Sequence, residues 1–238
     1  MRAMILAAGR GDRMRPLTDR LPKPMLIVGG KPLIVWHIEK LAAAGFTDVA
    51  INTAWLGQRI VEGLGDGARW GLTIHYSHES TGLETAGGIA HARHLLGEEP
   101  FLAINGDVFC DWDPARAAAA AAQLLERDAD IWLLMVDNPP QHANGDFAID
   151  GEGWLRNAAN DAQTATYAGI AVYRPSLFAE LDPNAPAPLR PLFDRAIAAR
   201  RALGSLHRGF WEDVGTPQRL DALDARLGGA RHGLTQAV

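Results

Sequence analysis

The chain of 238 residues is 47% hydrophobic and carries a formal net charge of −5 at pH 7. Its length allows one sizeable α/β domain or at most two small ones. The negative net charge argues against a general nucleic-acid binder, whose binding surface is basic. Cys110 is the single cysteine, so an intrachain disulfide is excluded and a reducing compartment is favoured.

No apolar run is long enough to span a membrane, and the N-terminal apolar run is too short for a secretion signal. We therefore expect a cytoplasmic protein with neither nucleic-acid nor membrane partners. Because the chain ends soon after its last predicted helix, we also expect a monomer without an added C-terminal domain.

The first predicted element is a short buried strand at residues 3–7, which leads into a basic loop. Gly9 and Gly11 allow backbone conformations and close ligand approaches that a side chain prevents. Three cations follow in the same loop: Arg13, Arg15 and Lys23. Backbone N–H groups and cations arranged in this way form a cradle for a polyphosphate.

Two common phosphate-binding motifs do not fit this loop. The dinucleotide fingerprint G-x-G-x-x-G fails because Met14 occupies the third glycine position. A P-loop fails because no Gly-Lys-Ser/Thr triplet follows. Taken alone, the glycines and arginines fit an ordinary strand-to-helix turn with solvated side chains better than a nucleotide site.

Helices and strands are predicted to alternate through the first half of the chain. Apolar residues at helical spacing, with proline in first turns and glycine after last turns, predict helices at 32–44, 58–64, 85–96 and 114–125. Asp113 is the expected cap of the last of these. Short apolar runs predict strands at 49–52, 72–76, 101–104 and 131–136. This alternation predicts a Rossmann-like, doubly wound, mostly parallel sheet, whose ligands bind beyond the carboxyl ends of the strands.

After about residue 139 the predicted elements become shorter. Strands are expected at 147–149, 154–155 and 166–173, and extended segments within 205–213. A helix is expected at 189–200, a stiff loop at 183–188 and a final helix from residue 218. We expect the short strands to add a small sheet to the same domain.

Two aspartates stand where predicted strands leave the sheet. Asp107 follows Ile104-Asn105-Gly106, and Asp213 follows a short aromatic stretch and precedes Gly215. Carboxylate oxygens are the ligands that Mg²⁺ prefers. An isolated Asn-Gly-Asp is more often a capped turn, so Asp107 alone favours that structural role. Whether the two aspartates meet does not follow from the pattern.

The complete opening stretch resembles the signature of sugar-1-phosphate nucleotidylyltransferases, G-x-G-x-R-x-x-P-x-T followed by P-K. The matching residues are Gly9, Gly11, Arg13, Pro16, Thr18, Pro22 and Lys23. Residues 51–58 and 211–216 are similar in detail to the bacterial members that act in cell-wall recycling. The resemblance implies transfer of a uridylyl group from UTP to N-acetylmuramic acid 1-phosphate, with release of pyrophosphate.

The same resemblance implies the site residues. The implied catalytic residues are Arg13, Lys23, Asp107 and Asp213, the two aspartates holding Mg²⁺. The implied nucleotide contacts are Ala8, Gly9, Gly11, Asp12, Arg13, Lys23, Glu79, Gly87 and Asn105, with Glu79 reading the base. The implied sugar contacts are Gly145, Asp146 and Gly169, together with one of Asn157, Asn160 and Asp161, between which the sequence does not decide. One domain of residues 1–238 then has a nucleotide-binding part, 1–138, and a sugar-binding part, 139–238, to which the small sheet belongs.

Other functions share the cradle. Related enzymes transfer guanylyl groups to mannose 1-phosphate, or thymidylyl or uridylyl groups to glucose 1-phosphate. Phosphocholine cytidylyltransferases also resemble it, although choline calls for an aromatic cage. A non-catalytic nucleotide sensor is the alternative of another class, and intact Lys23, Asp107 and Asp213 argue against it. The histidines lack the metalloprotease pattern, and no Gly-x-Ser-x-Gly supports a serine hydrolase.

Overall fold

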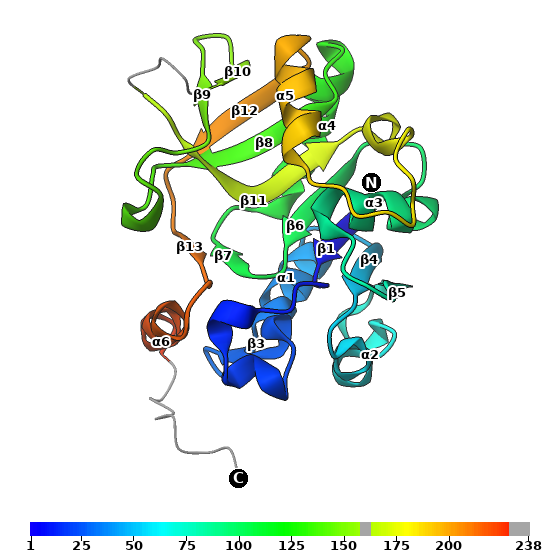
Figure 1. The fold of residues 1–238 in the computed structure, drawn as a ribbon, viewed down its shortest axis with the longest axis vertical. Coiled ribbons are helices and arrows are strands. Elements are labelled where there is room, and N and C mark those ends of the chain that lie inside the picture. Colours follow the sequence, from blue (N-terminus) through cyan, green and yellow to red (C-terminus); the bar gives the residue numbers. More distant parts are fainter. Residues whose placement is uncertain (158–162, 229–238) are drawn as a thin grey trace.

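A computed structural model describes residues 1–157 and 163–228. A seven-stranded sheet forms its centre (Figure 1). The strands lie in the order β12 (Ala202–His207), β8 (Ile131–Val136), β11 (Thr166–Tyr173), β6 (Phe101–Asn105), β1 (Ala3–Leu6), β4 (Asp48–Thr53) and β5 (Thr73–His78). β11 runs antiparallel to both neighbours, and the other adjacent pairs are parallel. The predicted α/β class with a mostly parallel sheet is confirmed.

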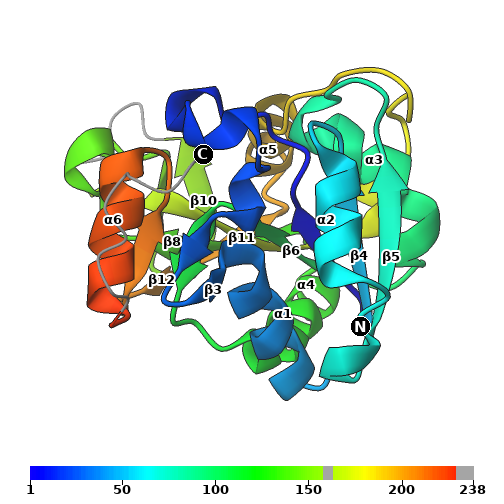
Figure 2. The ribbon, with the colours of Figure 1, turned by 90° about the horizontal axis from the view of Figure 1, so that it is seen from below.

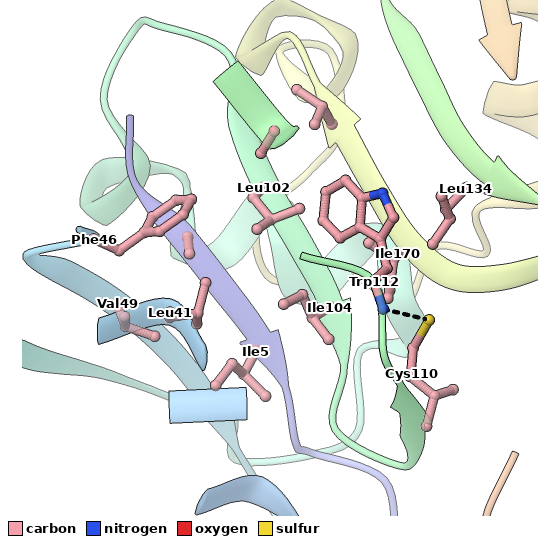
Figure 3. Packing of buried hydrophobic residues seen from close by; sticks show 14 of the residues in the cluster. Ile5, Leu41, Phe46, Val49, Leu102, Ile104, Cys110, Trp112, Leu134 and Ile170 are labelled. Atoms are coloured by element: carbon pink, nitrogen blue, oxygen red, sulfur yellow. Dashed lines mark hydrogen bonds between the residues drawn. The ribbon is translucent and has the colours of Figure 1, made fainter. Parts of the chain in front are cut away.

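Helices cover both faces of this sheet (Figure 2). α1 (Leu33–Ala43), α2 (Gly57–Leu64) and α4 (Ala117–Glu126) pack in one apolar layer. α3 (Glu84–Leu96) and α5 (Arg190–Ala198) pack in the layer on the opposite face. Residues of β1 alternate between the layers: Ile5 lies with Leu41 of α1 (Figure 3), whereas Met4 lies with α3. Burial on both faces explains why the strand reads as a continuous apolar run.

Apart from the helix predicted at 114–125, the predicted elements of the first half agree with the observed bounds to within two residues. The largest difference is at 114–125, where a 3-10 turn (Pro114–Arg116) precedes α4. The Asp113 side chain accepts a hydrogen bond from the Ala115 N–H at 2.9 Å, so its predicted capping role is confirmed. Other 3-10 turns lie at Asp12–Met14, Leu17–Asp19, Lys23–Met25, Ala68–Trp70, Pro140–His142 and Pro175–Phe178.

The expectation that residues 166–173 belong to a small added sheet is wrong. They form β11, which lies between β6 and β8 in the central sheet. Seven of its eight residues are buried, as a central strand requires. The small sheet consists of β9 (Phe147–Ile149) and β10 (Leu155–Asn157) alone.

A third apolar cluster joins the opening loop to the last described helix. Met14 and Leu26 of the loop pack with Val214 and with two leucines of α6 (Pro217–Arg226). The short hairpin of β2 (Ile27–Val28) and β3 (Lys31–Pro32) lies against α6, which it contacts through a hydrogen bond from the Gly29 N–H to Asp224. Packing therefore fixes the loop relative to the segment that carries Asp213.

Residues 205–213, predicted as extended, divide between two sheets. They contribute to β12 and then form β13 (Trp211–Asp213), which pairs antiparallel with β7 (Val108–Cys110). We call this pair the β7–β13 ribbon.

Within the described ranges, no helix has the length and apolar character needed to cross a membrane.

Candidate functional site

Two cavities open where the parallel strands end. The larger, of about 910 Å³, is bounded by the opening loop, the ends of β1, β4 and β6, and the segment 79–85 after β5. The smaller, of about 410 Å³, lies by β11 and the β7–β13 ribbon. Arg13, Asn105 and Asp107 border both cavities. These three residues therefore mark the junction at which ligands in the two cavities would meet.

Glycine is required at one of the two positions of the opening loop. Gly11 has a φ of +71°, and a Cβ there would lie 3.0 Å from Thr18 Cγ2 and 3.1 Å from Lys23 Cβ. The Thr18 hydroxyl donates to the Gly11 carbonyl at 2.8 Å, which holds the loop closed. At Gly9 a Cβ would meet nothing within 4 Å, so the space in front of it is open. Ala8, Gly9, Gly11 and Asp12, which are predicted nucleotide contacts, all line the larger cavity.

Alanine substitutions at the two glycines separate stability from binding. Gly11→Ala is expected to lower the unfolding free energy by about 1–2 kcal/mol, because it combines a left-handed backbone with crowding. Gly9→Ala is expected to change stability by less than about 0.5 kcal/mol and to weaken nucleotide binding by filling the open space. Urea unfolding and calorimetric titration with nucleotide measure the two effects. Equal stability of the two variants would contradict this interpretation of the loop.

The predicted cations of the loop have different surroundings. Lys23 is 7% exposed, and its Nζ lies 2.5 Å from Asp107 Oδ2. Arg13 is exposed, borders both cavities and makes no ion pair or hydrogen bond within the described part of the chain. Arg15, which we counted in the cradle, borders neither cavity, because its guanidinium pairs with Asp19 at 2.6 Å.

Arg10 supplies a cation that the sequence pattern did not single out. It lines the larger cavity, pairs with Asp12 at 3.3 Å, and places its guanidinium 4.6 Å from the centre of the Trp55 ring. Its position between the two loop glycines was the available signal. The larger cavity is thus bordered by three cations: Arg10, Arg13 and Lys23.

The β7–β13 ribbon brings Asp107 and Asp213 to the same end of the sheet. Asp213 lies opposite Val108, and the Val214 N–H donates to the Asp107 carbonyl at 2.9 Å. Both aspartates border the smaller cavity. The pairing joins residues more than a hundred positions apart, which explains why local patterns did not reveal it.

Each of these carboxylates has one oxygen paired with a cation. Asp107 Oδ2 pairs with Lys23, and Asp213 Oδ2 accepts from Arg219 Nη1 at 2.8 Å. The second oxygen of each has no hydrogen bond within residues 1–157 and 163–228. Two free carboxylate oxygens beside one cavity fit the hard oxygen ligands of Mg²⁺. Arg219, on α6, was not predicted, because only folding brings it to the site.

His37 of α1 packs beneath the ribbon. Its imidazole is 6% exposed and is hydrogen-bonded to the backbone of Val108. Burial, assisted by the nearby charge of Lys40, lowers the pKa of His37 from 6.5 to about 4. The side chain is therefore neutral at physiological pH and supports the strand that follows Asp107.

This pKa predicts acid sensitivity. Between pH 6.5 and about 4 the unfolded chain protonates His37 and the folded chain does not, so stability falls as the pH falls. We expect His37 to remove about 2 kcal/mol of unfolding free energy at about pH 5 relative to about pH 7.5. Urea unfolding of the wild type and of His37→Gln at both pH values measures how much of the change in unfolding free energy comes from His37. The same pH dependence in both proteins would contradict it.

The opposite end of the ribbon holds a second group of ligand-type side chains. Cys110, Asp111 and His207 place one ligand-type atom each within 4.8 Å of one another. His207 Nε2 and Asp111 Oδ1 form a hydrogen bond of 2.6 Å, and the Trp112 N–H donates to Cys110 Sγ (Figure 3). Burial raises the pKa of Cys110 to about 11, so the thiol stays protonated at neutral pH. We interpret this group as a structural contact.

A buried polar chain forms part of the wall of the larger cavity. Asn52 accepts a hydrogen bond from the Ala7 N–H at 2.8 Å and donates to Glu79 Oε1 at 2.7 Å. The other oxygen of Glu79 accepts from the Leu83 N–H at 3.0 Å. Glu79, predicted to read the base, lies in the cavity wall but is 2% exposed and has both oxygens engaged. Asn52, a polar residue in a predicted buried strand, was not chosen from the sequence.

Gly87, predicted as a nucleotide contact, is not among the residues that line the larger cavity. A Cβ at Gly87 would lie 2.6 Å from the Ala185 carbonyl oxygen, so this glycine lets α3 approach the loop 183–188. The N–H groups of Ala86 and Gly87 donate to the Ala187 carbonyl. Tight packing against a neighbouring loop, and not ligand approach, explains the small residue.

Of the predicted sugar contacts Gly145, Asp146 and Gly169, only Gly169 borders a cavity. Gly169 borders the smaller cavity, and a Cβ there would lie 2.7 Å from Asn105 Nδ2. Gly145 and Asp146 border neither cavity. Asp146 instead accepts from the Tyr167 N–H at 2.8 Å and contacts His142 Nε2 at 3.0 Å. It therefore positions residues that line the cavity.

Of the three candidates for the remaining sugar contact, only Asn157 lies in the described part of the chain, and it borders neither cavity. Asn157, at the end of β10, accepts a 3.5 Å hydrogen bond from Arg190, whereas Asn160 and Asp161 lie outside the described residues. Lining residues that the sequence did not indicate are Pro139, Gln141, His142, Thr166 and Trp211. Most belong to loops and strand ends whose neighbours are set by the fold.

Comparison with known proteins gives a consistent result. Residues 2–227 match the nucleotidyl transferase family. The chain is 48% identical to an N-acetylmuramate alpha-1-phosphate uridylyltransferase of Neisseria meningitidis, covering 96% of this chain and 99% of that protein. A protein of the same name from Caulobacter vibrioides is 34% identical, with 94% and 96% covered. A Bacillus anthracis structure, named for glucose-1-phosphate thymidylyltransferase, has a TM-score of 0.83 at 20% identity over 98% of both chains and shares the fold.

Proposed function

The chain belongs to the nucleotidyl transferase family, and from that premise we propose that it transfers a uridylyl group from UTP to N-acetylmuramic acid 1-phosphate. The products are UDP-N-acetylmuramic acid and pyrophosphate. The observation that carries the proposal is the 48% identity to the Neisseria uridylyltransferase over nearly the full length of both chains. Two cavities that meet at Arg13, Asn105 and Asp107 suit a reaction between two ligands.

The chemical step joins two anions. An oxygen of the sugar phosphate forms a bond to the α-phosphorus of UTP, and the bond from that phosphorus to the bridging oxygen breaks. Pyrophosphate leaves with the electron pair. The attacking phosphate oxygen is already ionised near neutral pH, so no general base is needed. The barrier is mainly repulsion between the phosphates together with the loss of their freedom of orientation.

The cations of the site would lower that repulsion. Lys23 is buried and held by Asp107, so its ammonium has a fixed position beside the junction. We assign it to the α-phosphate or to the incoming phosphate. Arg13 has no protein partner in the described part of the chain and borders both cavities, which suits it to the departing pyrophosphate. Lys23, as a fixed donor, and Arg13, as an unpaired one, would stabilise the developing charge without rearrangement of the site.

Asp107 and Asp213 would hold Mg²⁺ through their free carboxylate oxygens. When bound, the ion supplies charge neutralisation and a template for the phosphate oxygens. Lys23 and Arg219 fix the two carboxylates through their other oxygens. Asn105 of β6 borders both cavities and packs against Gly169 of β11, so it would lie between the nucleoside and the sugar. We place the enzyme in the cytoplasm, where UTP is available.

Pyrophosphate release over a grid of nucleoside triphosphates and phosphate acceptors tests the proposal. We expect release with UTP and N-acetylmuramic acid 1-phosphate to exceed that of every other pair by about tenfold or more. The other pairs include GTP with mannose 1-phosphate, dTTP or UTP with glucose 1-phosphate, and CTP with phosphocholine. A different preferred pair would contradict the assignment of the substrates. UTP binding without release for any pair would favour a nucleotide sensor.

A further inference from the structure

Glu84, at the start of α3, has a backbone conformation that its side chain disfavours. Its φ is +56°, in the left-handed region that favours glycine. Glutamate lacks the short side chain with which asparagine and aspartate stabilise this conformation locally. Such residues persist where the surrounding structure imposes them, and they are concentrated in ligand sites.

Hydrogen bonds on both sides of Glu84 impose this conformation. The Leu83 N–H donates to Glu79, and the Leu83 carbonyl accepts from the Ala187 N–H at 3.0 Å. On the other side, the N–H groups of Ala86 and Gly87 donate to the Ala187 carbonyl at 2.9 and 3.1 Å. The backbone at Glu84 is therefore held at a fixed place in the cavity wall.

The Glu84 side chain has no structural partner to account for it. It is exposed, lines the larger cavity, and makes no ion pair or hydrogen bond within the described ranges. Two other non-glycine residues with positive φ, Asp128 and Arg200, form ion pairs away from both cavities. Leu56 shares the cavity but carries no charge. Glu84 thus combines backbone strain, free carboxylate oxygens and a place in the nucleotide cavity.

Charge indicates which part of the nucleotide Glu84 meets. Arg13 and Lys23 of the loop after β1, and Asp107 after β6, lie at or beside the junction of the cavities, whereas Glu84 follows β5, two strands beyond β1 in the sheet. A carboxylate repels a triphosphate, so it favours the uncharged nucleoside at its own end of the cavity. Glu79, the neighbouring carboxylate, already has both oxygens engaged.

We propose that Glu84 recognises the nucleoside, its carboxylate accepting a hydrogen bond from the uracil N3–H or from a ribose hydroxyl. This inference rests on the proposed use of UTP. A carboxylate facing uracil N3–H also repels the N3 lone pair of cytosine, so it would contribute to selection of UTP over CTP.

Three variants test the proposal. Glu84→Gly and Glu84→Gln are expected to raise the KM for UTP and its calorimetric Kd by about tenfold or more. They should leave the KM for the sugar phosphate unchanged and reduce the preference for UTP over CTP. Glu84→Gly should keep or raise the Tm, because glycine relieves the strain. Arg200→Gly, which relieves the same strain at a φ of +54° outside both cavities, is the matched control and should keep the wild-type affinity for UTP.

Analogues identify the donor. Weak binding of dUTP to the wild-type protein, with no further loss in Glu84→Gly, assigns the ribose 2′-hydroxyl; the same result with N3-methyl-UTP assigns the base. UTP affinities of both Glu84 variants within twofold of the wild type, with an unchanged UTP preference, would overturn the inference. Because calorimetry needs no turnover, that outcome is distinct from failure of the proposed function, in which the wild-type protein releases no pyrophosphate.

Discussion

Replacing Lys23 by methionine is expected to lower kcat/KM by about a thousandfold and to leave the protein folded. Lys23 is 7% exposed, and its ammonium lies 2.5 Å from Asp107 at the junction of the two cavities. Methionine fills a similar volume, so packing around the side chain is kept while the fixed charge is lost. Asp107 remains partly exposed, and solvent can therefore stabilise its carboxylate in the variant.

Lys31→Met is the matched control for this experiment. Lys31 also forms an ion pair, with Glu39, and lies over the Trp36 ring, but it borders neither cavity. Its removal is expected to change kcat/KM by less than about twofold. Steady-state kinetics and thermal unfolding of the two variants side by side measure the difference. If the Lys23→Met enzyme keeps its activity within about threefold of the wild type, Lys23 has no role in the reaction.

Asp107→Asn and Asp213→Asn are each expected to reduce kcat by about a thousandfold, and the double variant by little more than either one. The reason is that both carboxylates would hold the same ion, so loss of either ligand disables the same site. Such a pair gives strongly non-additive effects in a double-mutant cycle. Single-turnover kinetics at saturating UTP, measured over a range of Mg²⁺ concentrations, separate loss of metal binding from loss of chemistry.

Asp111→Asn provides the control on the same ribbon. Asp111 lies at the opposite end of the ribbon, pairs with His207 and borders neither cavity, so it tests for general disturbance of the ribbon. Its kcat and Mg²⁺ dependence should match those of the wild type. Additive losses in the Asp107–Asp213 cycle, amounting to about a millionfold, would show that the two aspartates act separately.

Periodicity predicted where the individual strands lie in the sequence better than it predicted which strands pair with one another. β1 and β6 were recognisable because burial on both faces leaves a continuous apolar run. The run at 166–173 was recognised as a strand, but its insertion between β6 and β8 depends on pairings with residues 30 to 72 positions earlier. No local pattern encodes such a choice of partner, so the predicted small sheet included a strand that belongs to the central sheet.

The site shows the same division between local and distant information. Gly11 and Lys23 belong to one contiguous signature, and the structure places both beside the larger cavity. Arg219 reaches Asp213 only because α6 packs against the opening loop, and Asn52 reaches Glu79 only because β4 and β5 are neighbours. Gly87 and Asp146 were chosen by position along the chain, and folding gives both a structural role.

The arrangement of two anionic ligands around Arg13, Asn105 and Asp107 is tested most directly by a crystal structure with UDP-N-acetylmuramic acid and Mg²⁺ bound. We expect the uridine in the larger cavity, the sugar in the smaller one, and the pyrophosphate link beside Lys23, with Mg²⁺ on Asp107 and Asp213. A product whose phosphates lie away from Lys23, or an ion held by neither aspartate, would contradict it.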